Sequence, residues 1–294
     1  MNSLLERTVI VSGQPIFVAE TGEGPGVVML HGGGPGASGL SNYSRNIDAL
    51  ARSHRVIVPD LPGYGRSGKR FDHGDPFGFL AGAVRGMLDQ LGLASAHLVG
   101  NSLGGATALR LAMESPQRVG RLVLMGPGGI GMTRSLPTAG LRSLLSYYSD
   151  GGPSRAKLAT FIRDYLVYDG SAVPDEVIEK RYEASLDPEV IADPPLRRPS
   201  SPRTLWRMDL TRDPRLKTLP NPTLILWGRD DRVNRPSGGP MLAKLLPDAQ
   251  LIMTSRTGHW MQWERAELFN RLVVEFLRPE SLWAEKTVTE KSTE

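Results

Sequence analysis

The strongest chemical signal in the sequence is the pentapeptide G-N-S-L-G at Gly100–Gly104. A short apolar run before it predicts a strand, and Leu103–Met113 behind it predicts a helix. A serine between a strand and a helix, flanked by glycines, is typical of a nucleophile elbow, because the serine adopts a strained backbone that neighbouring chains approach closely. The alternative is an ordinary turn. The strand–turn–helix context favours Ser102 as a nucleophile, with the helix N-terminus stabilising developing negative charge.

A nucleophilic serine needs a general base, and chain position sorts the five histidines. In hydrolases with this elbow, the acid and then the histidine follow the serine along the chain. His259 is far downstream of Ser102 and follows the last predicted strand, so it is the candidate base. The remaining histidines are interpreted as structural or superficial: His31 bracing a glycine loop, His97 making a structural hydrogen bond, and His54 and His73 at the surface.

The third member of such a triad is a carboxylate between the serine and the histidine. The segment W-G-R-D-D-R at Trp227–Arg232 follows the penultimate predicted strand and offers Asp230 and Asp231. One of them is expected to hold the imidazole through Nδ1 and to stabilise its protonated form. The other is expected to cap the turn or to pair with an arginine. The residues alone do not choose between the two.

A glycine-rich loop, H-G-G-G-P-G at His31–Gly36, follows the third predicted strand. Hydrolases with the serine elbow carry an oxyanion donor at this place, and glycines let backbone N–H groups approach a substrate oxygen without a Cβ clash. The alternative is a phosphate or dinucleotide loop. The spacing is not G-x-G-x-x-G, no Lys-Ser/Thr follows, and Pro35 lacks an N–H, so the oxyanion interpretation is preferred.

A sheet must position these loops. Short apolar runs alternate with longer helical stretches, which predicts an α/β fold with a mostly parallel sheet and helices on both faces. The predicted strands are Thr8–Val11, Pro15–Glu20, Val27–Leu30, Arg55–Pro59, His97–Val99, Arg121–Met125, Thr223–Trp227 and Gln250–Met253. The main predicted helices are Leu80–Leu91, Leu103–Met113, Gly239–Leu246 and Ala266–Leu277.

Residues 132–209 break this alternation, since no run typical of a buried strand occurs there. The segment contains helical pieces at Leu141–Tyr148, Lys157–Tyr168 and Glu176–Ala184, and a Pro/Arg-rich stretch at Asp193–Arg203. An insertion of this kind between two strands predicts a helical lid over one edge of the sheet. We therefore expect a core formed by residues 1–131 and 210–280, a lid at 132–209, and a polar C-terminal tail at 281–294.

Composition excludes several classes of function. The 294 residues include no cysteine, which removes disulfide scaffolds, thiolate metal sites and cysteine nucleophiles. The net charge is only +4 and both signs are interspersed, so nucleic-acid binding is not expected. No apolar run approaches the roughly 20 residues of a membrane span, and the N-terminal residues lack the apolar region of a secretory signal. A cytoplasmic protein without a membrane partner is expected.

Together these motifs resemble a family of α/β-hydrolase enzymes, the meta-cleavage product hydrolases. The segments that carry the resemblance are His31–Gly36, Ser41–Asn46, Gly100–Gly105, Leu124–Gly129, Trp227–Val233 and Gly258–Glu264. The resemblance extends from about residue 15 to residue 278. It implies an α/β-hydrolase fold with an eight-stranded, mostly parallel sheet and a helical lid. It also implies cleavage of a C–C bond in 2-hydroxy-6-oxo-hexa-2,4-dienoates from aromatic or steroid degradation, without a metal or organic cofactor.

The resemblance assigns a role to each site residue. It implies Ser102 as nucleophile, Asp231 as acid and His259 as base, with the backbone N–H groups of Gly33 and Leu103 as the oxyanion hole. It implies that the dienoate end of the substrate contacts Gly34, Asn42, Asn101, Arg181 and Trp260. Arg181 resembles the family's carboxylate-binding arginine, although from the residues alone it would be a solvated surface side chain. Trp260 fits a core aromatic equally well.

The implied reaction proceeds through enol–keto tautomerisation and an acyl-enzyme to a 2-hydroxydienoate and a carboxylic acid. The alternative is a carboxylesterase with the same triad, and Arg181 and Asn101 discriminate because a simple ester has no carboxylate. A receptor-like protein of the same fold is a further alternative. The identity of the group beyond the scissile ketone stays open. Leu103 occupies a position where the family often has Met, and the stretch 193–203 is richer in Pro and Arg than expected of the family. A homo-oligomer is expected by resemblance only.

Overall fold

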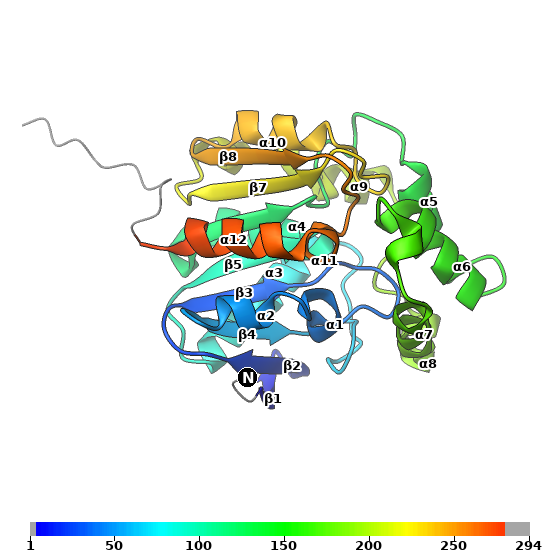
Figure 1. The fold of residues 1–294 in the computed structure, drawn as a ribbon, viewed down its shortest axis with the longest axis horizontal. Coiled ribbons are helices and arrows are strands. Elements are labelled where there is room, and N and C mark those ends of the chain that lie inside the picture. The colour runs from blue at the N-terminus through cyan, green and yellow to red at the C-terminus, as the bar shows by residue number, and fades with distance from the viewer. Residues whose placement is uncertain (1–3, 280–294) are drawn as a thin grey trace, which may run out of the picture.

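The computed structural model describes residues 4–279, so the C-terminal tail expected at 281–294 lies outside the described residues. One eight-stranded sheet runs through this part of the chain, in the order β1-β2-β4-β3-β5-β6-β7-β8 (Figure 1). The strands are β1 (Leu5–Val11), β2 (Gln14–Thr21), β3 (Gly26–Leu30), β4 (Arg55–Pro59), β5 (Ala96–Asn101), β6 (Val119–Met125), β7 (Thr223–Gly228) and β8 (Ala249–Thr254). β2 pairs in antiparallel fashion with both β1 and β4, and β3 to β8 run parallel to one another. The predicted sheet is confirmed.

Both faces of the sheet are buried, because successive side chains of a strand point to opposite sides. Val28 of β3 lies opposite Ile57 and Leu98 of the flanking strands, and all three belong to one apolar cluster. This cluster includes side chains of α3 (Pro76–Gln90), α4 (Leu103–Glu114) and α10 (Gly238–Leu245). The adjacent strand residues Val27 and Met29 belong to a second cluster on the other face. That face is covered by α1 (Gly39–Tyr43), α2 (Ile47–Leu50), α11 (Met261–Glu264) and α12 (Ala266–Leu277).

The strand order places the chemistry-bearing loops together. After β3 the chain adds β4 on one side and then crosses to add β5 on the other, so the order of connection reverses at β3. Leu30 at the end of β3 pairs with Gly100 near the end of β5. Ligands of open α/β sheets bind at the carboxyl ends of strands at such a reversal. The glycine loop after β3 and Ser102 after β5 consequently leave the sheet side by side.

The chain between β6 and β7 is helical throughout its regular elements, as expected. These elements are α5 (Ala139–Leu145), α6 (Arg155–Thr160), a π-helix at Phe161–Leu166, α7 (Asp175–Ala184), α8 (Pro188–Ala192) and α9 (Pro202–Met208), with short 3₁₀ turns. Figure 1 shows α5 to α8 gathered beyond one end of the sheet. Side chains of α5, α6, the π-helix and α7 share an apolar cluster with Trp260 and Trp263. The boundaries 132 and 209 predicted for the lid remain predictions.

The structure differs from the sequence-based expectation in its short elements. The predicted helix Lys157–Tyr168 is divided into α6 and the π-helix, and α1, α2, α8, α9 and α11 were not predicted. Helices of four to seven residues are too short to display the apolar period on which such predictions depend. Among residues 4–279, no helix is long and apolar enough to cross a membrane.

Candidate active site

Ser102 occupies the turn between β5 and α4 in a backbone conformation that serine rarely adopts, with φ 51° and ψ −110°. Its amide donates to the carbonyl of Met125 at 2.9 Å, which fixes the turn against β6. A Cβ on Gly100 would lie 2.5 Å from the Gly104 carbonyl oxygen, so this close approach requires glycine. The strand–turn–helix context predicted for Ser102 is therefore present, with the serine at the carboxyl edge of the sheet.

His259 is held by a buried carboxylate. Its Nδ1 lies 2.7 Å from Oδ2 of Asp231, and both side chains are almost fully buried. The other carboxylate oxygen, Oδ1, accepts from the amides of Val233 and Asn234, each at 2.8 Å. Asp230 instead accepts from the Thr257 amide at 3.3 Å. The sequence leaves the choice between the two aspartates open. In the structure Asp231 contacts the imidazole and Asp230 does not.

The second imidazole nitrogen of His259 is left free. Its Nε2 is buried and has no hydrogen-bond partner in the described part of the chain. Asp231 accepts a hydrogen bond from Nδ1, so Nδ1 carries the proton. Nε2 then has the lone pair that a general base uses. His259 and Ser102 line the same pocket. The amide of His259 also donates to Leu166 at 2.8 Å, which ties the histidine to the π-helix between β6 and β7.

The other histidines make structural contacts. His31 is fully buried, with Nε2 accepting from the Leu61 amide at 2.9 Å and Nδ1 2.8 Å from the Gly32 carbonyl oxygen, and burial lowers its pKa. His31 therefore braces the glycine loop, as expected. His97 accepts from the Arg121 amide at 2.9 Å, also as expected. The expectation of a surface position is wrong for His54, which packs in the interior with its ring 6.2 Å from that of His97.

Gly33 and Leu103 lie against each other beside the serine. A Cβ on Gly33 would lie 3.0 Å from Cδ2 of Leu103, so the Leu103 side chain packs against the Gly33 backbone. Leu103 is the first residue of α4, and its N–H has no intrahelical acceptor. The Tyr64 hydroxyl donates to the Gly33 carbonyl at 3.2 Å and holds that peptide in place. This arrangement can present two backbone N–H groups to one substrate oxygen.

Arg181 of α7 is the most unusual charge in the molecule. It is 4% exposed, and its guanidinium donates from Nε and Nη2 to the Pro35 carbonyl at 3.0 and 2.8 Å. No carboxylate of residues 4–279 pairs with it, and burial lowers its pKa to about 10. A Cβ on Gly34 would lie 2.5 Å from Nη2, so the glycine makes room for the arginine. The predicted solvated position is wrong, because α7 turns this side chain inward.

The remaining polar side chains are also buried. Asn101 donates to the carbonyls of Met125 and His259 at 3.3 Å each, and Asn42 accepts from Gln262 at 3.1 Å. Trp260 stacks on Trp263 with ring centroids 5.1 Å apart, and its buried indole N–H has no hydrogen-bond partner among residues 4–279. One pocket brings together Gly32, Gly33, Gly34, Asn42, Asn101, Ser102, Arg181, His259 and Trp260, with Leu144, Phe161 and Leu166. Asp231 lies behind His259.

Sequence reasoning missed several residues that shape this pocket. Phe161 lines it from the π-helix, an element whose wide turns occur often at functional sites but have no simple sequence signal. Glu264 accepts from the amides of Gly258 and Tyr168 at 2.9 and 2.7 Å and so supports the histidine loop, and burial raises its pKa. Within the described residues, no cluster of three or more His, Asp or Glu side chains could hold a metal ion.

Comparison with known proteins gives one consistent result. A family model described as the alpha/beta hydrolase family matches residues 27–272. The 2-hydroxy-6-oxo-6-phenylhexa-2,4-dienoate hydrolase of Burkholderia cepacia is 41% identical over 266 residues, which cover 89% of this chain and 91% of that protein. A 2-hydroxy-6-oxononadienedioate/2-hydroxy-6-oxononatrienedioate hydrolase of Comamonas testosteroni is similar to the same extent and with the same coverage. A solved structure, the meta-cleavage product hydrolase from Pseudomonas fluorescens IP01, superposes with a TM-score of 0.81 at 36% identity, covering 92% of this chain and 96% of that one.

Proposed function

Because the chain belongs to the α/β-hydrolase family, and within it to the meta-cleavage product hydrolases, we propose that its triad hydrolyses a C–C bond. In this proposal Ser102 is the nucleophile, His259 the general base and Asp231 the orienting acid. The substrate is a 2-hydroxy-6-oxo-hexa-2,4-dienoate, the class named for the relatives. The observation that carries the proposal is a buried arginine without a carboxylate in the same pocket as the serine and histidine.

In this proposal Arg181 makes the enzyme selective for substrates that carry a carboxylate. A buried charge is costly unless it is paired, and the Pro35 carbonyl is only a neutral partner. A substrate carboxylate would complete the pairing, since a planar guanidinium can bind it through two parallel hydrogen bonds. A simple ester has no group to place there. The arginine therefore favours a dienoate over an ordinary ester substrate.

The first step is ketonisation of the dienol. The polar end of the substrate lies among Gly34, Asn42, Asn101 and Trp260, and the unpaired indole N–H of Trp260 offers a donor to one of its oxygens. Nε2 of His259, which has no hydrogen-bond partner among the described residues, accepts the proton from the 2-hydroxyl and delivers it to C5 of the carbon chain, so the imidazole is neutral again for the next step. The product of this step is a ketone whose C–C bond can break once the carbonyl is attacked.

Cleavage then follows acyl-transfer chemistry. Ser102 attacks the distal ketone while His259 takes its proton, and the amides of Gly33 and Leu103 stabilise the oxyanion. The C–C bond breaks as the carbonyl re-forms, and the leaving dienolate takes the electron pair and is protonated by the imidazolium of His259, which returns His259 to its neutral form. Water activated by His259 hydrolyses the acyl-enzyme to a carboxylic acid. Loss of one oxyanion donor typically costs about 3–4 kcal/mol in serine hydrolases, so the glycine loop should be sensitive to substitution.

The test uses a yellow 2-hydroxy-6-oxo-hexa-2,4-dienoate that carries a 6-phenyl or 6-alkyl group. Loss of its visible absorbance is followed for the wild type and for Ser102→Ala, with a nitrophenyl ester in parallel. We expect fast bleaching that requires Ser102 and greatly exceeds ester cleavage. Brisk ester cleavage without bleaching would instead make the protein a carboxylesterase and leave Arg181 without a catalytic purpose.

The setting of the reaction is proposed from the family resemblance. We propose that the protein acts in the cytoplasm as a homo-oligomer. Size-exclusion chromatography with light scattering measures the assembly, and a mass of about 32 kDa in solution would contradict it, since one chain has a mass of 32.1 kDa. Fractionation of the source cells tests the location.

A further inference from the structure

The loop that carries His259 lies against the end of the π-helix Phe161–Leu166. A Cβ on Gly258 would lie 2.7 Å from the carbonyl carbon of Val167 and 2.8 Å from the carbonyl oxygen of Leu166, so this close approach requires glycine. The last carbonyls of a helix have no donor within it, and that of Leu166 accepts from the His259 amide at 2.8 Å. The histidine backbone is therefore in direct contact with the helical segment between β6 and β7.

One carboxylate joins these two segments. Glu264 ends the short helix α11, which follows the histidine loop. Its Oε1 accepts from the Gly258 amide at 2.9 Å, and its Oε2 accepts from the Tyr168 amide at 2.7 Å. One oxygen thus holds the residue before His259, and the other holds the chain just beyond the π-helix. We refer to these two hydrogen bonds as the Glu264 bridge.

The Glu264 bridge depends on a charged group in a place where burial makes charge costly. Glu264 is half-buried, and burial raises its pKa, whereas the amide hydrogen bonds and the charge of Arg265 lower the pKa by less. The Arg265 guanidinium donates instead to the hydroxyl of Thr257 and to the carbonyls of Ser255 and Arg256. A glutamine of the same size has one acceptor oxygen and one donor nitrogen at its end. Only a carboxylate can offer an oxygen to each of the two amides.

The position of the imidazole depends on the backbone as well as on the triad acid. Asp231 holds the ring of His259 at Nδ1. On one side, the histidine loop is tied to Asp230, which accepts from the Thr257 amide at 3.3 Å and donates its own amide to the Thr257 carbonyl at 3.0 Å. On the other side, the loop is tied by the Glu264 bridge. A misplacement of about 1 Å in a reacting group can cost about 100-fold in rate, so loosening of this loop should reach the reaction.

We propose that Glu264 is a positioning residue, which acts on the reaction through His259 by holding the histidine loop against the end of the π-helix. The inference rests on the proposed function for the roles of Ser102 and His259. Phe161 and Leu166 of the π-helix line the pocket that contains both residues, and Glu264 does not line it. Loss of the Glu264 bridge therefore removes no contact with the substrate, and its effect should fall on kcat and not on KM.

The test measures kcat and KM of Glu264→Gln with a 6-phenyl dienoate and with p-nitrophenyl acetate, because His259 is the base for both substrates. We expect kcat to fall about ten- to hundredfold for both, while KM stays near the wild-type value. Hydrogen–deuterium exchange is measured in the same variant. Deuterium uptake should rise in a peptide that contains Gly258 or Tyr168, because one of these amides loses its acceptor.

Matched variants separate positioning from general damage. Glu267→Gln makes the same substitution on an exposed carboxylate in the first turn of α12 and should leave kcat, KM and uptake unchanged. If Glu264→Gln fails to fold, Tyr168→Pro removes one amide of the Glu264 bridge and should lower kcat in the same way. Tyr168→Ala keeps that amide and is the control for the lost side chain.

Two results would overturn the proposal. One is an unchanged kcat in Glu264→Gln, including the case in which only stability toward urea is lost, since Glu264 would then be a structural residue. The other is a fall in kcat that leaves the deuterium uptake of both amides unchanged. If the wild type does not bleach the dienoate, the C–C hydrolase function fails, whereas the ester kinetics still decide the role of Glu264.

Discussion

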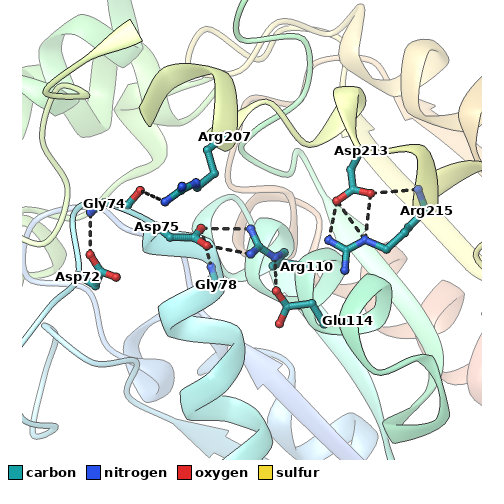
Figure 2. A network of polar contacts seen from close by, with 9 residues as sticks. All are labelled: Asp72, Gly74, Asp75, Gly78, Arg110, Glu114, Arg207, Asp213 and Arg215. Carbon is teal, nitrogen blue, oxygen red and sulfur yellow. Dashed lines mark hydrogen bonds and ion pairs between the residues drawn. The ribbon is translucent and has the colours of Figure 1, made fainter. Parts of the chain in front are cut away.

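Two arginines of this protein, Arg110 and Arg181, differ in their partners and in the direction in which their pKa is shifted. Arg110 of α4 donates from its two Nη atoms to Asp75 at 3.1 and 2.8 Å and from Nε to Glu114 at 2.5 Å (Figure 2). Burial alone would lower its pKa, but the hydrogen bonds to the two carboxylates raise it. Arg181 is buried more deeply, donates to a carbonyl, lies 5.7 Å from the centroid of the Trp260 ring, pairs with no carboxylate of residues 4–279, and has a lowered pKa.

The different partners of the two arginines distinguish a structural network from the candidate active site. The Arg110 network is complete within the chain, because Asp75 also caps α3 at the Gly78 amide and Arg207 of α9 donates to the neighbouring carbonyl of Gly74 (Figure 2). Such a network makes the packing of α3, α4 and α9 specific. The charge of Arg181 has no carboxylate partner among residues 4–279, and a bound anion would offset the cost of burying it. An unsatisfied buried charge is therefore the better guide to function.

The largest loss of activity is expected on substitution of Asp231, the carboxylate that contacts His259. Asp231→Asn places an amide on Nδ1 of His259 and favours the wrong tautomer, so kcat should fall about 10⁴-fold while the fold persists. Steady-state kinetics on a dienoate measure this. Asp230→Asn is the matched control, since Asp230 contacts only the Thr257 amide and should retain most activity. The reverse order of effects would reassign the acid.

Arg181→Met should produce the next largest effect. It removes the charge that binds the substrate carboxylate and keeps an apolar side chain of similar length in the pocket, so kcat/KM for a dienoate should fall about 10²- to 10³-fold. Cleavage of p-nitrophenyl acetate should change little, and stability toward urea should stay equal or rise, because a costly buried charge is gone. Equal losses on both substrates would make Arg181 a structural residue like Arg110.

Arg110→Met should show the opposite pattern. It leaves the carboxylates of Asp75 and Glu114, both partly buried, without their cation. The free energy of unfolding should fall by about 2 kcal/mol, while kcat/KM stays near the wild-type value. Arg215→Met is the control from the same region of Figure 2, since the Arg215–Asp213 pair is more exposed and should contribute about 0–1 kcal/mol. A loss of activity without a loss of stability in Arg110→Met would remove the contrast between the two arginines.

The same contrast explains what could be predicted from the sequence. The order of the strands along the chain, Ser102 and His259 follow from local patterns, because an apolar run, a glycine-flanked serine and a late histidine are visible in short segments. The choice of Asp231 over Asp230 depends on which carboxylate faces the imidazole, and neighbouring residues in a turn do not reveal this. The inward position of Arg181 depends on how the helices after β6 fold onto the sheet. Its burial is a tertiary property, and only family resemblance pointed to Arg181 in advance.

The smallest expected effect is the loss of stability at acid pH that buried histidines cause. It should arise both at the candidate active site and away from it. His31 in the site and His97 away from it each accept a backbone N–H and must be neutral to do so. Burial lowers both pKa values, that of His97 to about 4. The unfolded chain binds protons near pH 6.5 that the folded chain does not, so stability should fall as pH drops from about 6.5 toward 4.

Urea unfolding between pH 7 and pH 4.5 measures this slope. His97→Gln can still accept the Arg121 amide through its side-chain carbonyl but cannot titrate, so it should lose about 1 kcal/mol less stability than the wild type over this range. His73→Gln is the matched variant, because it replaces an imidazole that contacts the exposed Asp193 instead of one packed in the interior. If His97→Gln follows the wild-type curve, burial of His97 contributes nothing to acid sensitivity, and the slope has to be assigned to other buried groups, of which His31 and His54 also have pKa values lowered by burial.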